Sequence, residues 1–180
     1  MNVPNFKCCS EEELWRYVAW HLEGAGIHSV LVGGAVVAIY TEGLYRSGDL
    51  DMVPDDFQKS KIPSVMESIG FMPGKSRHYR NPDCQHLFIE FPPGPVELGN
   101  EFSVTPDELL VEGRTIRLLS PTDCVKDRLA AYNPLETPGL LRSGRVGLPP
   151  PKRACEPGKR RKMVRAGGRL CGIQRAARTS

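Results

Sequence analysis

Hydrophobic and polar positions in residues 10–132 alternate between helical and strand-like spacing. Ser10 and Glu13 have the spacing of a capping box, and apolar residues then recur every three or four positions as far as Leu22. This pattern predicts an amphipathic helix that begins after Ser10. A β-branched run over residues 28–32 follows it and predicts a buried strand.

The same alternation continues along the chain. After the first helix and strand, the pattern predicts a helix over 35–41, a strand over 49–53, a helix over 62–69, strands over 77–79, 86–91 and 115–119, and a helix over 120–132. Strands interleaved with helices predict an α+β fold with a mixed β-sheet of four or five strands and helices mainly on one face.

Charge divides the chain at Tyr132. Residues 1–132 carry a net charge of −7, whereas residues 133–180 carry +10, which together give the +3 of the whole chain. The second part lacks Phe, Trp and Tyr and is rich in Pro, Gly and Arg. Because it offers little to bury, we expect a core over 1–132 that is incomplete at its C-terminal side and a disordered basic tail over 133–180.

Two interpretations of the tail remain open. The abrupt change to Arg, Gly, Pro, Ala and Cys after Asn133 is typical of a GC-rich gene translated in a shifted frame, and we favour a frameshift or truncation there. The alternative is a genuine basic tail that binds nucleic acid through its phosphates. A frameshift predicts an exposed apolar face and reduced or absent activity.

Composition excludes several classes of protein. The chain has 180 residues and no apolar run of the roughly 18 residues that a membrane span needs, and its N-terminus resembles no secretory signal. We therefore expect a soluble, cytoplasmic protein without membrane contact. The six cysteines show no CxxC pair and no spacing typical of metal ligands, so we expect reduced structural thiols.

Two acids in the predicted strand 49–53 are the strongest chemical signal. Asp49 and Asp51 lie two positions apart, so their side chains project from the same face. A divalent cation such as Mg²⁺ relieves the repulsion between neighbouring carboxylates. Glu90 is a third acid in an apolar strand, where an unpartnered carboxylate is costly to bury. A shared metal ion would explain all three acids.

A second signal lies upstream of these acids. Gly33-Gly34 stands where a strand enters a helix, so backbone N–H groups can approach a phosphate closely at the helix N-terminus. Ser47 can add a hydroxyl donor near the same phosphates. Taken singly, a glycine pair or a pair of strand acids is usually a feature of turn geometry or of a solvated strand face. The ordered set is far more specific.

In this order the motifs resemble those of the nucleotidyltransferase superfamily, which has the polymerase-beta-like fold. The chain is similar in particular to small bacterial nucleotidyltransferases of the abortive-infection and toxin-antitoxin type. The similarity covers roughly residues 10–132 and rests on segments 31–35, 45–51, 88–93 and 119–129.

The resemblance implies a role for each matching residue. Asp49, Asp51 and Glu90 would hold two Mg²⁺ ions as the catalytic acids. The resemblance assigns nucleotide binding to four residues: Gly33, Gly34, Ser47 and Lys126. An NTP would be the substrate, with RNA or a protein as acceptor and a cognate antitoxin as partner. For Lys126, a solvated position on the helix face is the alternative.

Two functions from different classes follow. The first is a metal-dependent enzyme that moves an NMP from an NTP to a hydroxyl of RNA, protein or a small molecule. The second is a non-catalytic, incomplete transferase core that binds a nucleotide, nucleic acid or a partner. The three acids favour the enzyme, because a pure binding module has no need of them, and the abrupt end of the core favours the module.

Overall fold

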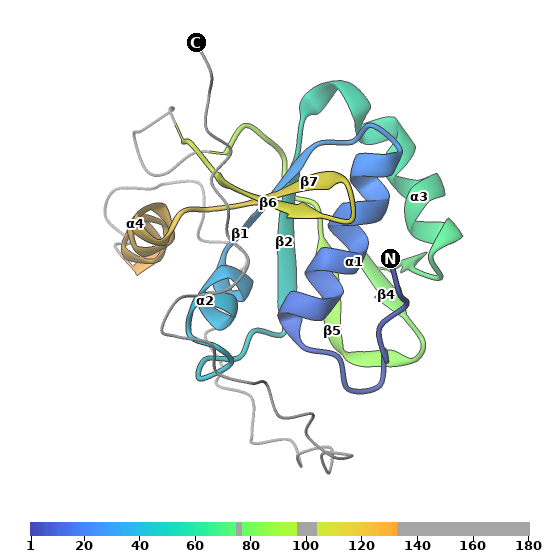
Figure 1. The fold of residues 1–180 in the computed structure, drawn as a ribbon, viewed down its shortest axis with the longest axis horizontal. Coiled ribbons are helices and arrows are strands. Elements are labelled where there is room, and N and C mark those ends of the chain that lie inside the picture. Colours follow the sequence, from blue (N-terminus) through green and yellow to red (C-terminus); the bar gives the residue numbers. More distant parts are fainter. Residues whose placement is uncertain (75–76, 97–103, 133–180) are drawn as a thin grey trace.

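The computed structural model describes residues 1–74, 77–96 and 104–132 (Figure 1). The predicted basic tail, residues 133–180, lies outside the described residues, as does the hypothesis of a frameshift there. In chain order the elements are α1 (Glu11–Gly24), β1 (Ser29–Val32), α2 (Gly34–Tyr40), β2 (Asp49–Pro54), the 3₁₀ helix η1 (Asp56–Lys61), α3 (Ile62–Ser68), β3 (Met72–Pro73), β4 (His78–Asn81), β5 (Cys84–Glu90), β6 (Asp107–Val111), β7 (Arg114–Leu118) and α4 (Pro121–Tyr132).

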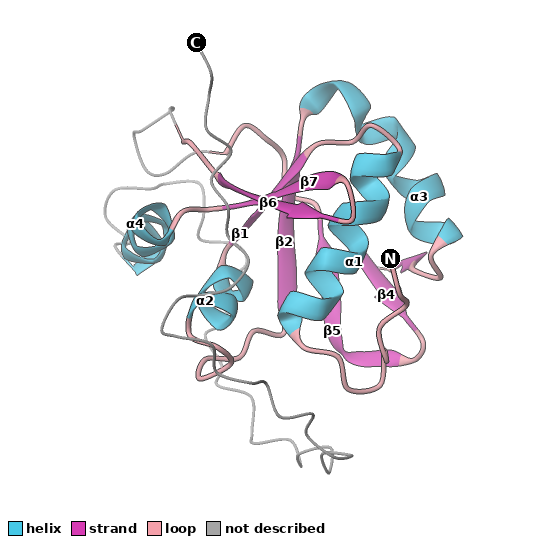
Figure 2. Cartoon of the chain, in the orientation of Figure 1, coloured by secondary structure: helices cyan, strands magenta, loops and turns pink. Residues whose placement is uncertain are grey.

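The described residues form one seven-stranded sheet with the order β3-β4-β5-β2-β1-β7-β6 (Figure 2). The pairs β1–β7 and β2–β5 are parallel and the remaining pairs are antiparallel, so the predicted α+β class with a mixed sheet is confirmed. The expected number of four or five strands was too low. The two strands that the pattern did not predict are the edge strands β3 and β6.

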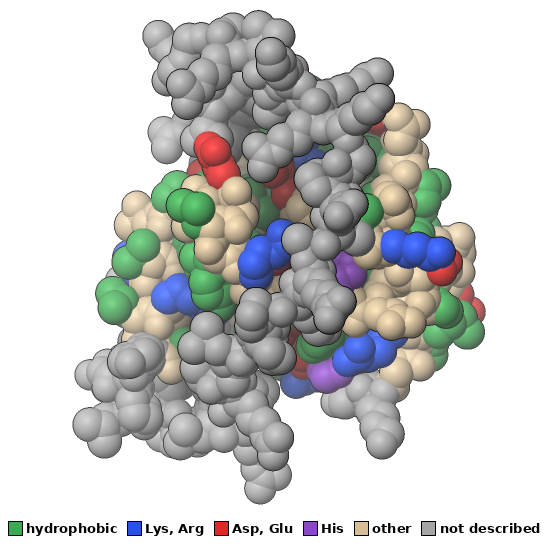
Figure 3. Space-filling view, turned by 90° about the horizontal axis from the view of Figure 1, so that it is seen from below, with side chains coloured by type: hydrophobic (Ala, Val, Ile, Leu, Met, Phe, Trp, Pro, Cys, Tyr) green, Lys and Arg blue, Asp and Glu red, His purple; other side chains and the backbone are tan. Residues whose placement is uncertain are grey.

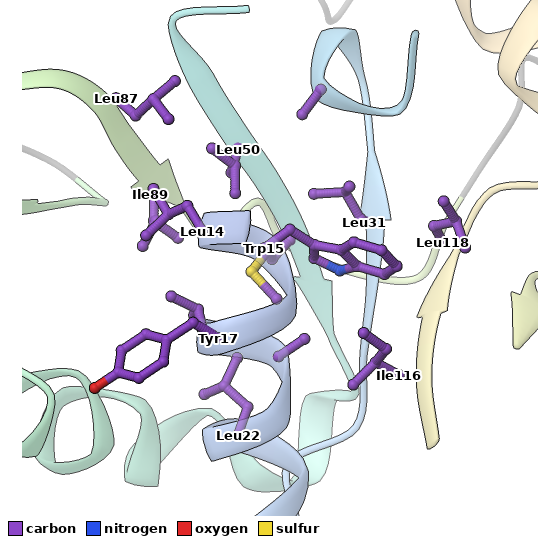
Figure 4. Close-up of a cluster of buried hydrophobic side chains, with 14 of the residues drawn as sticks. Leu14, Trp15, Tyr17, Leu22, Leu31, Leu50, Leu87, Ile89, Ile116 and Leu118 are labelled. Carbon is purple, nitrogen blue, oxygen red and sulfur yellow. The ribbon is translucent and has the colours of Figure 1, made fainter. Parts of the chain in front are cut away.

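Helix α1 begins as predicted. Ser10 accepts a hydrogen bond from the backbone N–H of Glu13, and the Glu13 carboxylate accepts one from the backbone N–H of Ser10, which completes the capping box. The helix lays its apolar side chains against the sheet to form the core (Figure 4). The labelled core residues are Leu14, Trp15, Tyr17 and Leu22 from α1 and Leu31, Leu50, Leu87, Ile89, Ile116 and Leu118 from the sheet.

Successive side chains of β2 point to opposite faces of the sheet. Leu50 and Met52 are fully buried in the core that α1 covers. Asp49 and Asp51 are the residues between them and are only half-buried, so they project from the opposite face. The core thus fixes the register of β2 and with it the direction of both carboxylates.

The C-terminal elements complete the described fold. Strands β6 and β7 form a hairpin through Glu112 and Gly113, both with positive φ, as a two-residue turn between twisted strands requires. Helix α4 then packs beside α2. In the described part of the chain, no helix has the length and apolar character needed to cross a membrane.

Candidate functional site

The turn from β1 to α2 lies close against the start of β2. Gly33 has φ of 75°, a conformation that suits glycine, and a Cβ placed on it would lie 2.5 Å from Oδ2 of Asp51. A Cβ on Gly34 would lie 2.8 Å from Oγ of Ser47. The two glycines therefore let the backbone approach the acidic strand more closely than other residues would allow.

The sheet brings the three predicted acids to one face. Strands β2 and β5 are parallel neighbours in which Asp51 is paired with Glu90, so their side chains project side by side. Asp49 lies two residues before Asp51 and shares that face. The structure thus brings Glu90, which is distant in sequence, next to Asp49 and Asp51 at the edge of the Gly33-Gly34 turn.

The position of Asp51 beside two other acids changes the pKa of its carboxyl group. Burial, followed by the negative charges of Asp49 and Glu90, raises the pKa of the Asp51 carboxyl from 3.8 to about 7. Three carboxylates with oxygen ligands only are the donor set that a hard divalent cation prefers. A bound cation would relieve the mutual repulsion that raises this pKa, so the residues present suit such an ion.

Ser47 connects the site to the start of α1. Its hydroxyl donates to Oδ1 of Asp49 at 2.8 Å, and its backbone N–H donates to Oε1 of Glu11 at 2.9 Å. The Glu11 side chain is only 3% exposed and also pairs with Nε of Arg46 at 3.2 Å. The loop that presents Ser47 and Asp49 is therefore anchored to the first turn of α1. In this structure the predicted phosphate donor Ser47 orients Asp49.

Glu90 has two basic neighbours that sequence reasoning did not connect to it. Nε2 of His78 lies 2.9 Å from Oε2 of Glu90, and a guanidinium nitrogen of Arg77 lies 3.4 Å from Oε1. His78 is directly opposite Glu90 in the β4–β5 pair. A shared metal ion was expected to offset the cost of burying Glu90, whereas in the structure both carboxylate oxygens already have partners.

Two charged residues of helix α4 act on Asp51, and neither was predicted as a site residue. Lys126, expected at the triphosphate, pairs with Asp123 at 3.4 Å, one helical turn away. The α4 charges that act on Asp51 are those of Arg128, which lowers its pKa, and of Asp127, which raises it. Arg128 is itself held by Asp127 at 2.6 Å. Arg128 is two positions beyond Lys126, and the local sequence carries no signal that would distinguish the two cations.

The three carboxylates do not line the cavity at the other end of β1. That cavity has a volume of about 440 Å³, and its lining includes His28, Val30 and Arg117. The candidate site lies instead on the sheet face beside the Gly33-Gly34 turn. In the view of Figure 3, basic, acidic and hydrophobic side chains are interspersed, and those described there form no single continuous basic surface.

Comparison with known proteins gives one match. No protein-family model matches the sequence, and no curated protein matches it. Among solved structures the chain is similar to an antigenic nucleotidyltransferase-like protein from Paracoccidioides brasiliensis, with 16% sequence identity, a TM-score of 0.49, and coverage of 68% of this chain and 72% of that one. At this level the likeness assigns neither family nor activity.

Proposed function

We propose that this protein is a Mg²⁺-dependent nucleotidyltransferase that moves an NMP from an NTP to a hydroxyl group. The observation that carries the proposal is the arrangement of Asp49, Asp51 and Glu90 on one sheet face beside the glycine turn. Such a face combines oxygen ligands for cations with a backbone that a phosphate can approach closely.

The three acids have different roles in this proposal. Asp49 and Asp51 would hold two Mg²⁺ ions, and Glu90 would help to hold one of them. Bound there, the ions would activate the attacking hydroxyl and neutralise the leaving pyrophosphate. Ser47 keeps the Asp49 carboxylate oriented through its 2.8 Å hydrogen bond.

The nucleotide phosphates lie against the Gly33-Gly34 turn in this proposal. With no side chain at either position, the turn packs closely against Asp51 and Ser47, so phosphates bound to the turn would lie next to the acids. Arg128 joins the site as a cation because it already acts on Asp51 from α4. Lys126 must break its ion pair with Asp123 before it can bind the triphosphate. RNA, a protein or a small molecule is the acceptor, and a cognate antitoxin is the expected partner if the toxin-antitoxin resemblance holds.

A non-catalytic binding module is the second candidate. The observation that favours it is the engagement of both Glu90 oxygens by His78 and Arg77. A carboxylate whose two oxygens already contact an imidazole and a guanidinium needs no metal ion. Under this alternative, the site binds a nucleotide or a partner without transferring anything.

Transfer of labelled nucleotide from each NTP, with Mg²⁺, onto total RNA and onto the protein itself tests the proposal. We expect the Asp49→Asn and Asp51→Asn variants to transfer nucleotide at least about 100-fold more slowly than the wild type. Losses of this size follow when a group that stabilises transition-state charge is removed. Asp55→Asn removes an exposed acid just beyond the same strand and serves as the control. Transfer that survives both Asn substitutions would refute the catalytic assignment. Nucleotide binding without any transfer would favour the binding module.

A further inference from the structure

Two cysteines and a histidine meet at the start of β5, well away from the acidic face. Sγ of Cys9 lies 4.0 Å from Sγ of Cys84, although the two residues are 75 positions apart. The ligand atoms of Cys9, Cys84 and His86 all lie within 4.8 Å of one another. On β5, His86 and Cys84 lie four and six positions before Glu90, or about 13 and 20 Å, so this cluster is separate from the carboxylates.

The sulfur separation suits a shared metal ion better than a disulfide. Two thiolates bound tetrahedrally to Zn²⁺ at 2.3 Å are about 3.8 Å apart, close to the 4.0 Å between Cys9 and Cys84. A disulfide would require the sulfurs to approach to about 2.05 Å. Without an ion, the two thiols share a hydrogen bond.

His86 has the hydrogen bond typical of a metal-binding histidine. Its Nε2 lies 2.9 Å from the backbone carbonyl oxygen of Cys9. Because a carbonyl oxygen only accepts, the proton lies on Nε2, and Nδ1 keeps the lone pair that a metal ion needs. Metal-ligating histidines commonly donate their other ring N–H to a carbonyl in this way.

The burial of the three side chains indicates how an ion would reach them. Cys9 and Cys84 are buried and His86 is half-buried, so an ion would enter from the side of His86.

We propose that Cys9, Cys84 and His86 bind Zn²⁺ through two thiolates and one imidazole, with the fourth coordination position taken by water. The ion would replace the thiol protons of both cysteines, and the two protons would be released to water. It would also tie the segment before α1 to the first residues of β5, so that metal binding stabilises the fold.

Cobalt(II) titration of the full chain tests this site, because thiolate ligands give Co²⁺ an intense near-ultraviolet charge-transfer band that carboxylates cannot produce. We expect one equivalent of Co²⁺ to develop this band and Zn²⁺ to abolish it, whereas excess Mg²⁺ should leave it unchanged. Asp51→Asn should retain the band, which separates this site from the acidic one.

Variants locate the ligands. Cys9→Ser and Cys84→Ser should abolish or shift the band, and His86→Gln should weaken Zn²⁺ affinity about 10- to 100-fold while both thiols remain. Cys8→Ser changes the exposed neighbour of Cys9, and Cys124→Ser changes a buried thiol on α4, so both should behave like the wild type. A band that persists in Cys9→Ser and Cys84→Ser overturns the assignment. Absence of the band in the wild type also overturns it, with or without a disulfide between Cys9 and Cys84 by peptide mapping.

Discussion

His78 and Glu90 face each other across the β4–β5 pair, with 2.9 Å between Nε2 and Oε2. Arg77 lies 3.4 Å from the other carboxylate oxygen. The third acid of the site is therefore held by two basic side chains from the neighbouring strand and the loop before it. A cation that binds Glu90 must compete with at least one of them, and Arg77 is the more exposed, at 55%.

Arg77→Gln should lower the Mg²⁺ concentration that gives half-maximal nucleotide transfer. The substitution removes a positive charge that competes for Glu90, and the expected change is about two- to fivefold, as for a partly exposed ion pair. Arg80→Gln is the matched control, since Arg80 lies on β4 but stacks on Phe88 at 4.6 Å. A Mg²⁺ requirement that rises in Arg77→Gln would show that Arg77 positions Glu90 for the metal.

Gly33→Ala should impair both stability and transfer. An alanine there must adopt a positive φ and place its Cβ 2.5 Å from Oδ2 of Asp51. We expect a loss of about 1–3 kcal/mol from the backbone alone and, because Asp51 must move, a fall in transfer of about 10- to 100-fold. Urea denaturation and the transfer assay measure the two effects.

Gly43→Ala is the control for this substitution. Gly43 has φ of 81°, but nothing lies within 4 Å of a Cβ placed there. Gly43→Ala should therefore lose stability because of its positive φ, but it should retain nucleotide transfer. Equal losses of transfer in Gly33→Ala and Gly43→Ala would contradict a specific role for the close approach of Gly33 to Asp51.

Glu11→Ala should destabilise the fold by about 1–3 kcal/mol, because it leaves the backbone N–H of Ser47 without its partner. Glu12→Ala removes a first-turn acid from the same helix, but Glu12 only pairs with Arg16 at an exposed i,i+4 position, which is worth about 0.5 kcal/mol or less. Denaturation midpoints of the two variants measure the difference. Equal midpoints would mean that the buried carboxylate does not anchor the loop.

Features that depend on neighbouring residues were predictable from the sequence. The capping box at Ser10 and Glu13 needs only residues three apart, and it starts α1 as expected. The two-residue period placed Asp49 and Asp51 on one face of a strand. The hairpin of β6 and β7 was missed because β6 was not recognised as a strand, although Glu112-Gly113 after the apolar run 109–111 is a turn signal.

Features that depend on strand pairing were not predictable from local pattern. The contact between His78 and Glu90 follows from the β4–β5 register, and that between Cys9 and Cys84 joins the N-terminal segment to β5. Cysteine spacing therefore indicated no metal ligands, although folding brings two cysteines and a histidine together. The same limit applies to α4, where the charge of Arg128 acts on Asp51, whereas nucleotide binding by Lys126 stays a prediction.

The stability of the protein should fall as the pH rises from about 4 to about 7, through the contribution of Asp51. Its carboxyl has a pKa of about 7 in the fold and of 3.8 when unperturbed. Between these values the folded protein holds a proton that the unfolded chain has released, so raising the pH favours unfolding. Above pH 7 both states have lost the proton, and the destabilisation of the fold by Asp51 no longer changes with pH.

Asp51→Asn should remove this pH dependence, because Asn carries no proton to release. We expect the variant to gain on the order of 2 kcal/mol relative to the wild type between pH 4 and pH 8. Urea denaturation at several pH values measures the gain, and Asp55→Asn, an exposed acid just beyond the same strand, should follow the wild type. Since Mg²⁺ favours the ionised carboxylate, adding it at pH 7 should stabilise the wild type more than Asp51→Asn. Parallel pH profiles for the wild type and Asp51→Asn would show that the three carboxylates do not interact in the way their placement implies.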